Sequence, residues 1–143
     1  MPKMQIGETE FELSVVDYKR DMDICESIEG FIDKDMAWLD IRLAVKNRYL
    51  DISMCDELLV ISELESIIDN CDAILHNRPL KQEELYFTEP DISMRFYPHV
   101  CQAEISIELR DSRGVYVGEY WTITLVRDKI KELLDGLKAE TAR

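Results

Sequence analysis

The sequence has 143 residues, of which 46% are apolar, which is enough for one globular domain with one core. Its 17 Lys and Arg stand against 30 Asp and Glu, a net charge of −13, which disfavours nucleic acids and anionic membranes as partners and favours a basic protein. Acidity of this kind is also typical of a cytosolic protein whose charge serves only solubility, and both interpretations stay open.

The opening 13 residues carry too many charges for an export signal, and no apolar run is long enough to span a membrane. We therefore expect a cytoplasmic protein. Its four cysteines are scattered and show no CxxC spacing. We expect Cys25, Cys55, Cys71 and Cys101 to be reduced core residues rather than disulfides or metal ligands.

Alternation of apolar and polar residues predicts strands at residues 3–7 and, after a turn at Glu8-Thr9, from about Phe11 to about Tyr18. The same period of two recurs at residues 37–46 and 49–55, which we expect to pair as a hairpin around Asn47, a residue that tolerates positive φ. Residues 19–35 are ambiguous: their apolar positions fit a helical face, but Gly30 weakens a helix by about 1 kcal/mol. The segment is either a solvated cover over a sheet edge or an acidic recognition surface.

Residues 62–76, SELESIIDNCDAILH, have apolar residues at helical spacing and predict the central helix. The apolar stripe consists of Leu64, Ile67, Ile68, Cys71, Ile74 and Leu75. Ser62 and Glu65 fit a capping box at its start, and Pro79 follows its end.

The second half predicts strands at residues 84–88, 92–98, 100–109 and 116–125, then a helix over residues 126–139. Pro90 interrupts the first pair of strands, and Gly114 supplies a turn before the last strand. Short turns between strands indicate antiparallel pairing. The chain is thus predicted to be one α+β domain over residues 1–143, a mainly antiparallel sheet with the central and C-terminal helices packed on it.

Motifs for chemistry are missing from the sequence. There is no phosphate-binding glycine loop, HExxH or CxxC, and the two histidines, His76 and His99, have no ligand spacing. Cys71 and His76 are five residues apart on a helix and point to different faces. We expect no catalytic residue, no metal and no cofactor. A small-ligand-binding or enzymatic domain with its site in the concavity of the sheet remains the alternative, and an accessory subunit is a third possibility.

Several stretches carry a resemblance to a known family. They are Phe11-Glu12-Leu13 with Val15 and Tyr18, Trp38-Leu39-Asp40-Ile41 with Leu43 and Val45, Leu58-Leu59, residues 62–75, Phe87-Thr88-Glu89-Pro90-Asp91-Ile92 with Phe96, and Ile105-Ile107-Leu109. Together they resemble the WapI-type family of immunity proteins, the antidotes to wall-associated polymorphic toxins of bacteria. The chain departs from that pattern in its long acidic segment at residues 19–35.

The resemblance implies a non-catalytic protein that binds a toxin domain. Such toxins are often nucleases with basic clefts, and an acidic antidote can occupy such a cleft in place of the phosphate backbone. The candidate contact carboxylates are Asp21, Asp23, Glu26, Glu29, Asp33, Asp35, Glu83, Glu84, Glu89 and Asp91. For Glu89 a structural role in the turn before Pro90 is the competing interpretation. The oligomeric state stays open.

Overall fold

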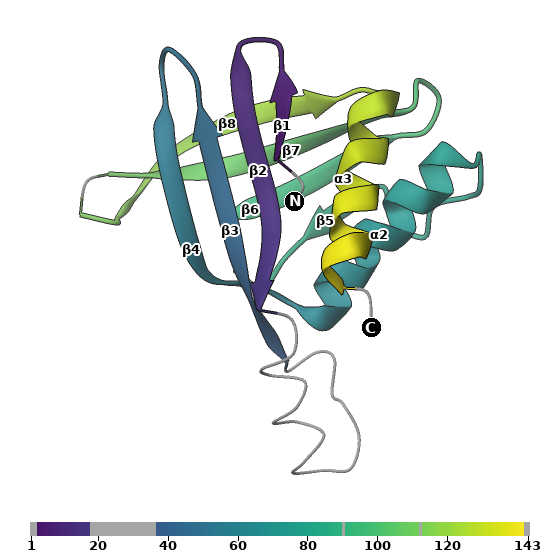
Figure 1. Cartoon of the computed structure of the whole chain (residues 1–143), viewed down its shortest axis with the longest axis horizontal. Helices are drawn as coiled ribbons and strands as arrows, with labels where there is room; N and C mark the ends of the chain where they lie inside the picture. Colours follow the sequence, from purple (N-terminus) through teal and green to yellow (C-terminus); the bar gives the residue numbers. More distant parts are fainter. Residues whose placement is uncertain (1–2, 18–36, 90, 112, 142–143) are drawn as a thin grey trace.

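A computed structural model describes residues 3–17, 37–89, 91–111 and 113–141. The described chain forms two antiparallel four-stranded sheets and two helices, so the α+β prediction is confirmed. Figure 1 shows the sheets packed face to face with their strands crossing at a large angle, and both helices closing one side. The periodicity of the sequence predicts one mainly antiparallel sheet, whereas the structure divides the strands between two sheets.

The first sheet has the order β1 (Lys3–Ile6), β2 (Thr9–Asp17), β3 (Trp38–Lys46) and β4 (Asp51–Val60). The residues expected to face inward along β2 and β3 are buried. β4 runs five residues beyond the predicted end at Cys55. It does so because residues 56, 57, 59 and 60 stay paired with β3 up to the start of the helix.

The β3–β4 turn differs from its prediction. Asn47 does not adopt a positive φ; the non-glycine residues that do, within the described chain, are Asn77 and Cys101. The Asn47 side-chain oxygen instead accepts the backbone N–H groups of Tyr49 and Leu50, both at 2.8 Å. The side chain thus forms the turn by hydrogen bonding to the backbone.

The second sheet has the order β5 (Glu84–Tyr86), β6 (Ile92–Tyr97), β7 (Gln102–Arg110) and β8 (Tyr116–Leu125). Its inward residues alternate as predicted, with Ile92, Met94, Phe96, Ala103, Ile105 and Ile107 buried. β5 is shorter than predicted and ends before the Glu89-Pro90 break.

Helix α2 (Ile61–Leu75) begins one residue before the predicted cap. The expected Ser62–Glu65 capping box is wrong: Glu63 accepts the Val60 backbone N–H at 3.0 Å, and its other oxygen accepts the Thr88 N–H at 2.6 Å. Glu63 therefore ties the start of α2 to the segment after β5. The predicted stripe is buried at Leu64, Ile67, Cys71 and Ile74 and half-buried at Ile68 and Leu75.

Helix α3 (Arg127–Thr141) buries Ile130, Leu133, Leu134 and Leu137 as expected. It packs against α2 and against strands of both sheets, so it seals the side of the core between them. Near its end, Glu140 accepts the Val15 backbone N–H at 2.9 Å. Partial burial raises the pKa of this carboxyl above its ordinary value.

The buried side chains of both sheets and both helices form one continuous core. Of the cysteines, Cys71 lies in this core, whereas Cys101 is half-buried and Cys55 is exposed. The expectation of a core role is therefore wrong for Cys55, because it lies on the outer face of β4; Cys25 lies outside the described residues. Neither described helix is long and apolar enough to cross a membrane.

Candidate functional site

Six of the ten predicted contact carboxylates, Asp21, Asp23, Glu26, Glu29, Asp33 and Asp35, lie outside the described residues. The described chain stops at Asp17 and resumes at Ala37, directly before Trp38. Asp17 pairs with Asp40 on β3. The segment that carries these six carboxylates is thus attached at the end of the first sheet where β3 begins.

Glu83 and Glu84 lie at the start of β5. Glu83 is exposed, and Glu84 forms an ion pair with Arg95 on the outer face of the second sheet. Tyr86, 76% exposed, donates its hydroxyl to Glu84 at 2.8 Å. Glu84 is therefore already engaged by two neighbours. This face is accessible, but its central carboxylate is neutralised.

Glu89 and Asp91 lie instead in a hollow at the end of the molecule where β3 and β4 meet the β5–β6 connection. We call it the acidic hollow. It has a volume of about 360 Å³ and is lined by Trp38, Asp56, Glu57, Leu58, Glu89, Asp91 and Arg110. The structure thus brings two of the predicted residues together with two carboxylates of β4 that sequence reasoning did not single out.

A β-bulge in β4 presents these two new carboxylates. Leu39 pairs with Leu59 and Asp40 pairs with Glu57, so Leu58 is an extra residue in β4. Alternation breaks at this point: Asp56 and Glu57 are both exposed, and Leu58 and Leu59 are both buried. Bulges re-aim side chains in this way and are frequent beside functional sites. The sequence signal is two adjacent acids followed by two leucines in an otherwise alternating strand.

Asp91 forms the buried base of the acidic hollow. Its side chain is 1% exposed and pairs through Oδ1 with the guanidinium of Arg110, whose side chain is 28% exposed. Arg110 also donates to the Tyr116 hydroxyl at 2.8 Å. Asp91 Oδ2 and Arg110 Nε are buried and find no hydrogen-bond partner among the described residues. Asp91 is therefore buried and neutralised by Arg110 rather than exposed on the acidic surface, and its role as a contact residue stays a prediction.

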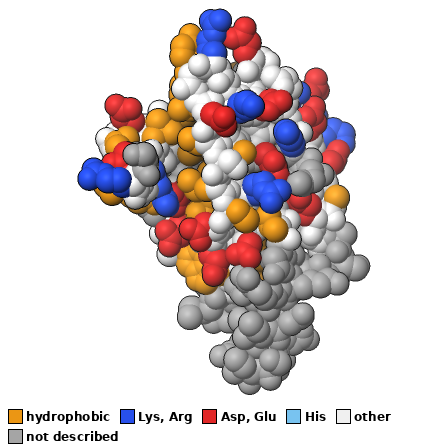
Figure 2. Space-filling model, turned by 60° about the vertical axis from the view of Figure 1, so that its left-hand side comes forward, with side chains coloured by type: hydrophobic (Ala, Val, Ile, Leu, Met, Phe, Trp, Pro, Cys, Tyr) orange, Lys and Arg blue, Asp and Glu red, His pale blue; other side chains and the backbone are white. Residues whose placement is uncertain are grey.

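The rim of the hollow differs from its base. Within the described chain, no Lys or Arg forms an ion pair with Asp56, Glu57 or Glu89, whereas the base carboxylate Asp91 pairs with Arg110. Figure 2, which brings the β4 side forward, shows Asp and Glu side chains gathered low on this face beside hydrophobic ones. The rim thus concentrates negative charge that none of the described Lys and Arg side chains neutralises.

The β7–β8 hairpin projects next to the hollow. Its apolar side chains are exposed: Val115 is 54%, Tyr116 37%, Val117 48% and Tyr120 60% exposed. Tyr116 joins this arm to the hollow, because the guanidinium of Arg110 lies 4.7 Å from its ring centre. Partial burial raises the pKa of the Tyr116 hydroxyl, which keeps it a neutral donor and acceptor.

Asp111 shapes the tip of this hairpin. Its carboxylate accepts the backbone N–H groups of Arg113 at 2.8 Å and Val115 at 3.0 Å. These hydrogen bonds lower the pKa of Asp111. Gly114 follows with a φ of +80°, a conformation that glycine adopts without strain. The Asp111 side chain and Gly114 thus fix the conformation of the hairpin tip.

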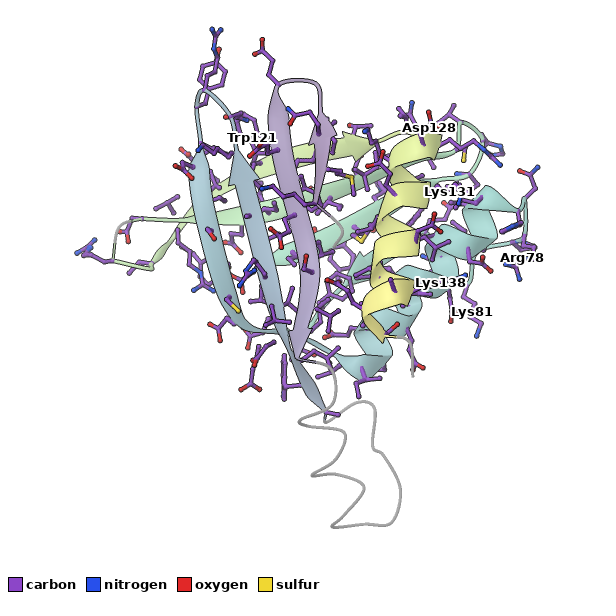
Figure 3. All side chains as sticks on the ribbon, in the orientation of Figure 1. Arg78, Lys81, Trp121, Asp128, Lys131 and Lys138 are labelled. Carbon is purple, nitrogen blue, oxygen red and sulfur yellow. The ribbon has the colours of Figure 1, made fainter. Side chains whose placement is uncertain are left out.

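The opposite side of the molecule, around the helices, carries charges of both signs. Figure 3 shows Arg78, Lys81, Lys131 and Lys138 on that side. A groove of about 610 Å³ runs there between α2 and the following loop. Two charges that line it pair with each other: Asp72 binds Arg78. Asp72 also lies 3.7 Å from Lys138, and Arg78 is the main cause that lowers the pKa of Asp72. Acidic and basic side chains thus lie together on this side, whereas the rim of the hollow carries three carboxylates without an ion-pair partner among the described residues.

Catalytic or metal-binding clusters are not evident in the part of the chain that the structure describes. No three His, Cys, Asp or Glu residues there are placed to hold a metal ion. The buried carboxylates there are Glu12 and Asp91, which lie on different sheets. Each has its own partner, the Ser14 hydroxyl at 2.8 Å and Arg110. The arrangement suits recognition of another molecule by charge and apolar contact.

Comparison with known proteins gives one result. The model of the immunity protein WapI-like family matches residues 4–143, nearly the whole chain. Neither the curated proteins nor the solved structures include a match.

Proposed function

Because the chain belongs to the WapI-like immunity protein family, we propose that it binds and neutralises a cognate bacterial toxin domain without catalysing a reaction itself. The finer points of the proposal are a basic toxin, such as a nuclease, and a site of action in the cytoplasm. The net charge of −13 supports a basic partner, because opposite charge speeds encounter and fixes orientation.

The observation that carries the proposal is the family match together with the acidic hollow and its apolar neighbour. Protein interfaces combine desolvated aromatic anchors with charged groups that set orientation. The described residues of this kind are Tyr116 and Tyr120 on the hairpin and three carboxylates at the hollow that have no ion-pair partner among the described residues, Asp56, Glu57 and Glu89. Glu83, Glu84 and the six acids of residues 19–35 complete the proposed contact set.

The experiment is co-expression with the toxin encoded by the neighbouring gene. The toxin alone should arrest growth, the pair should grow, and the two proteins should co-purify. Because exposed charges are screened by salt, raising NaCl from 50 to 500 mM should weaken the measured affinity about tenfold or more, mainly through a slower association rate. Growth arrest that persists with both proteins present, without co-purification, would refute the proposed function.

A further inference from the structure

We propose that the acidic hollow is the pocket for one arginine side chain of the toxin. This inference rests on the proposed function and goes beyond it by naming the place on this chain and the chemical group it receives. Four features of the described residues support it: a buried carboxylate oxygen at the base without a hydrogen-bond partner, carboxylates at the rim without an ion-pair partner, an aromatic side wall, and the available volume.

The base of the hollow offers an acceptor that the chain does not use. Asp91 Oδ1 is bound by Arg110, but Oδ2 has no hydrogen-bond partner among the described residues, although the side chain is only 1% exposed. Leaving a buried charged oxygen unpaired is costly, and native structures rarely do so without a ligand, ion or water. A donor that enters the hollow and hydrogen-bonds to Oδ2 removes this cost. The free energy recovered in this way adds to the affinity for the ligand.

The carboxylates of the rim determine the sign of the charge that the ligand must carry. Asp56, Glu57 and Glu89 carry three negative charges without an ion-pair partner in the described chain, and Arg110 is neutralised by Asp91. A cation entering the hollow therefore meets net negative charge at the rim, above a neutral ion pair at the base. An anion is repelled, and a neutral group leaves the carboxylates desolvated and unpaired.

The side wall distinguishes arginine from lysine. Trp38 lines the hollow beside the carboxylates, and a planar guanidinium can stack on an indole while it donates to carboxylates along its edge. Five N–H donors in a fixed fork serve Asp91 Oδ2 and two rim carboxylates at once, which a compact ammonium does less well. The volume of about 360 Å³ corresponds to roughly a dozen waters at ~30 Å³ each, so the side chain enters without displacing strands.

The test measures binding of the purified cognate toxin to three forms of the full chain by calorimetry. The first is the parent. The second is the rim variant, Asp56→Asn, Glu57→Gln and Glu89→Gln. The third is a matched control with the same change in charge at exposed positions away from the hollow, Glu8→Gln, Glu132→Gln and Asp135→Asn. Thermal melting of all three confirms that each is folded.

We expect the rim variant to bind at least tenfold more weakly, mainly through faster dissociation, and the control to bind within about twofold of the parent. Double-mutant cycles between Glu57→Gln and each surface arginine of the toxin changed to lysine should then find one arginine that is coupled to this residue. Changing to lysine keeps the charge, so coupling reports the guanidinium.

The outcomes are separable. Equal loss in the rim variant and the control would overturn the inference, because net charge alone would explain it, and so would unchanged binding of a folded rim variant. A rim variant that loses affinity without any coupled arginine would also overturn the named ligand. Failure of the parent chain to bind the toxin would refute the proposed function instead.

Discussion

The ion pair between Asp91 and Arg110 should be one of the strongest single contributors to the stability of the second sheet. We predict that Arg110→Met destabilises the protein by about 2–3 kcal/mol. Removing one partner of a buried pair costs about 3–5 kcal/mol because the other charge stays buried. The lower figure applies here because the Arg110 side chain is 28% exposed, so water partly compensates its loss, while Asp91 is 1% exposed. Methionine keeps the unbranched stem and removes only the charge.

This free energy corresponds to a measurable shift in melting temperature. For 143 residues the entropy of unfolding near the midpoint is roughly 0.3 kcal/mol/K, so about 2–3 kcal/mol lowers the midpoint by about 7–10 °C. Urea unfolding followed by tryptophan fluorescence gives the free energy directly, provided that the denaturant slope is unchanged. The double variant Asp91→Asn with Arg110→Met should be more stable than Arg110→Met alone, because no buried charge is left unpaired.

Arg95→Met is the matched control. Arg95 also pairs with a carboxylate, Glu84, but its side chain is 56% exposed and that of Glu84 is 35% exposed. Exposed pairs contribute at most about 1 kcal/mol, so this variant should melt within about 3 °C of the parent. If Arg110→Met melts like the control, or if the double variant is less stable than Arg110→Met alone, the reasoning about the buried pair is refuted.

Three further predictions follow from burial and hydrogen bonding. Ile67→Ala should cost about 3 kcal/mol in urea unfolding and Ile68→Ala clearly less, because Ile67 is fully buried and Ile68 half-buried; equal costs would contradict the orientation of α2. Burial raises the pKa of Cys71 to about 12, so iodoacetamide at pH 8 should label exposed Cys55 in the native protein and Cys71 only in urea, as read by peptide mass spectrometry. Early labelling of Cys71 would show that the core opens there. Asp111 has a lowered pKa, so the stability it contributes is present above the ordinary value of 3.8 and is lost as the pH falls through its lower folded value. Asp111→Asn should therefore lower the melting temperature at pH 7 and match the parent once the carboxylate is protonated; a pH-independent difference would contradict this.

The periodicity of the sequence predicted most of the fold because it follows directly from which face of each element is buried. The alternation along β3 and β7 and the stripe on α2 are simple consequences of a two-sided strand and a helical turn. The predicted helix boundary was wrong because a neighbouring residue made the capping hydrogen bond instead. At the start of α2, Ser62 had the residue type of a cap, but Glu63 reached both the Val60 and Thr88 backbones and fixed the boundary one residue earlier.

The site was predicted less completely, because it depends on contacts between segments far apart in the sequence. No pattern in the sequence around Asp91 identifies Arg110 as its partner, because Arg110 lies 19 residues later, on β7. Asp56 and Glu57 became visible as site residues only through the bulge at Leu58, which interrupts a pattern that period-two reasoning extends. Of the carboxylates named from resemblance, Glu89 has a position that suits contact, and Asp91 supports the site from beneath.

The packing of α3 has a consequence for how the molecule is made. Each sheet forms from one continuous stretch of chain, yet α3, which follows both, contacts β1 and β2. During synthesis the first sheet can pair its strands early and the second sheet can cover most of its apolar face, but the part beneath α3 stays exposed to water until Leu137 has emerged from the ribosome. Each molecule would therefore become able to bind a toxin only after its synthesis is nearly complete. A bacterium that relies on it would need fully folded protein in the cell before the toxin arrives.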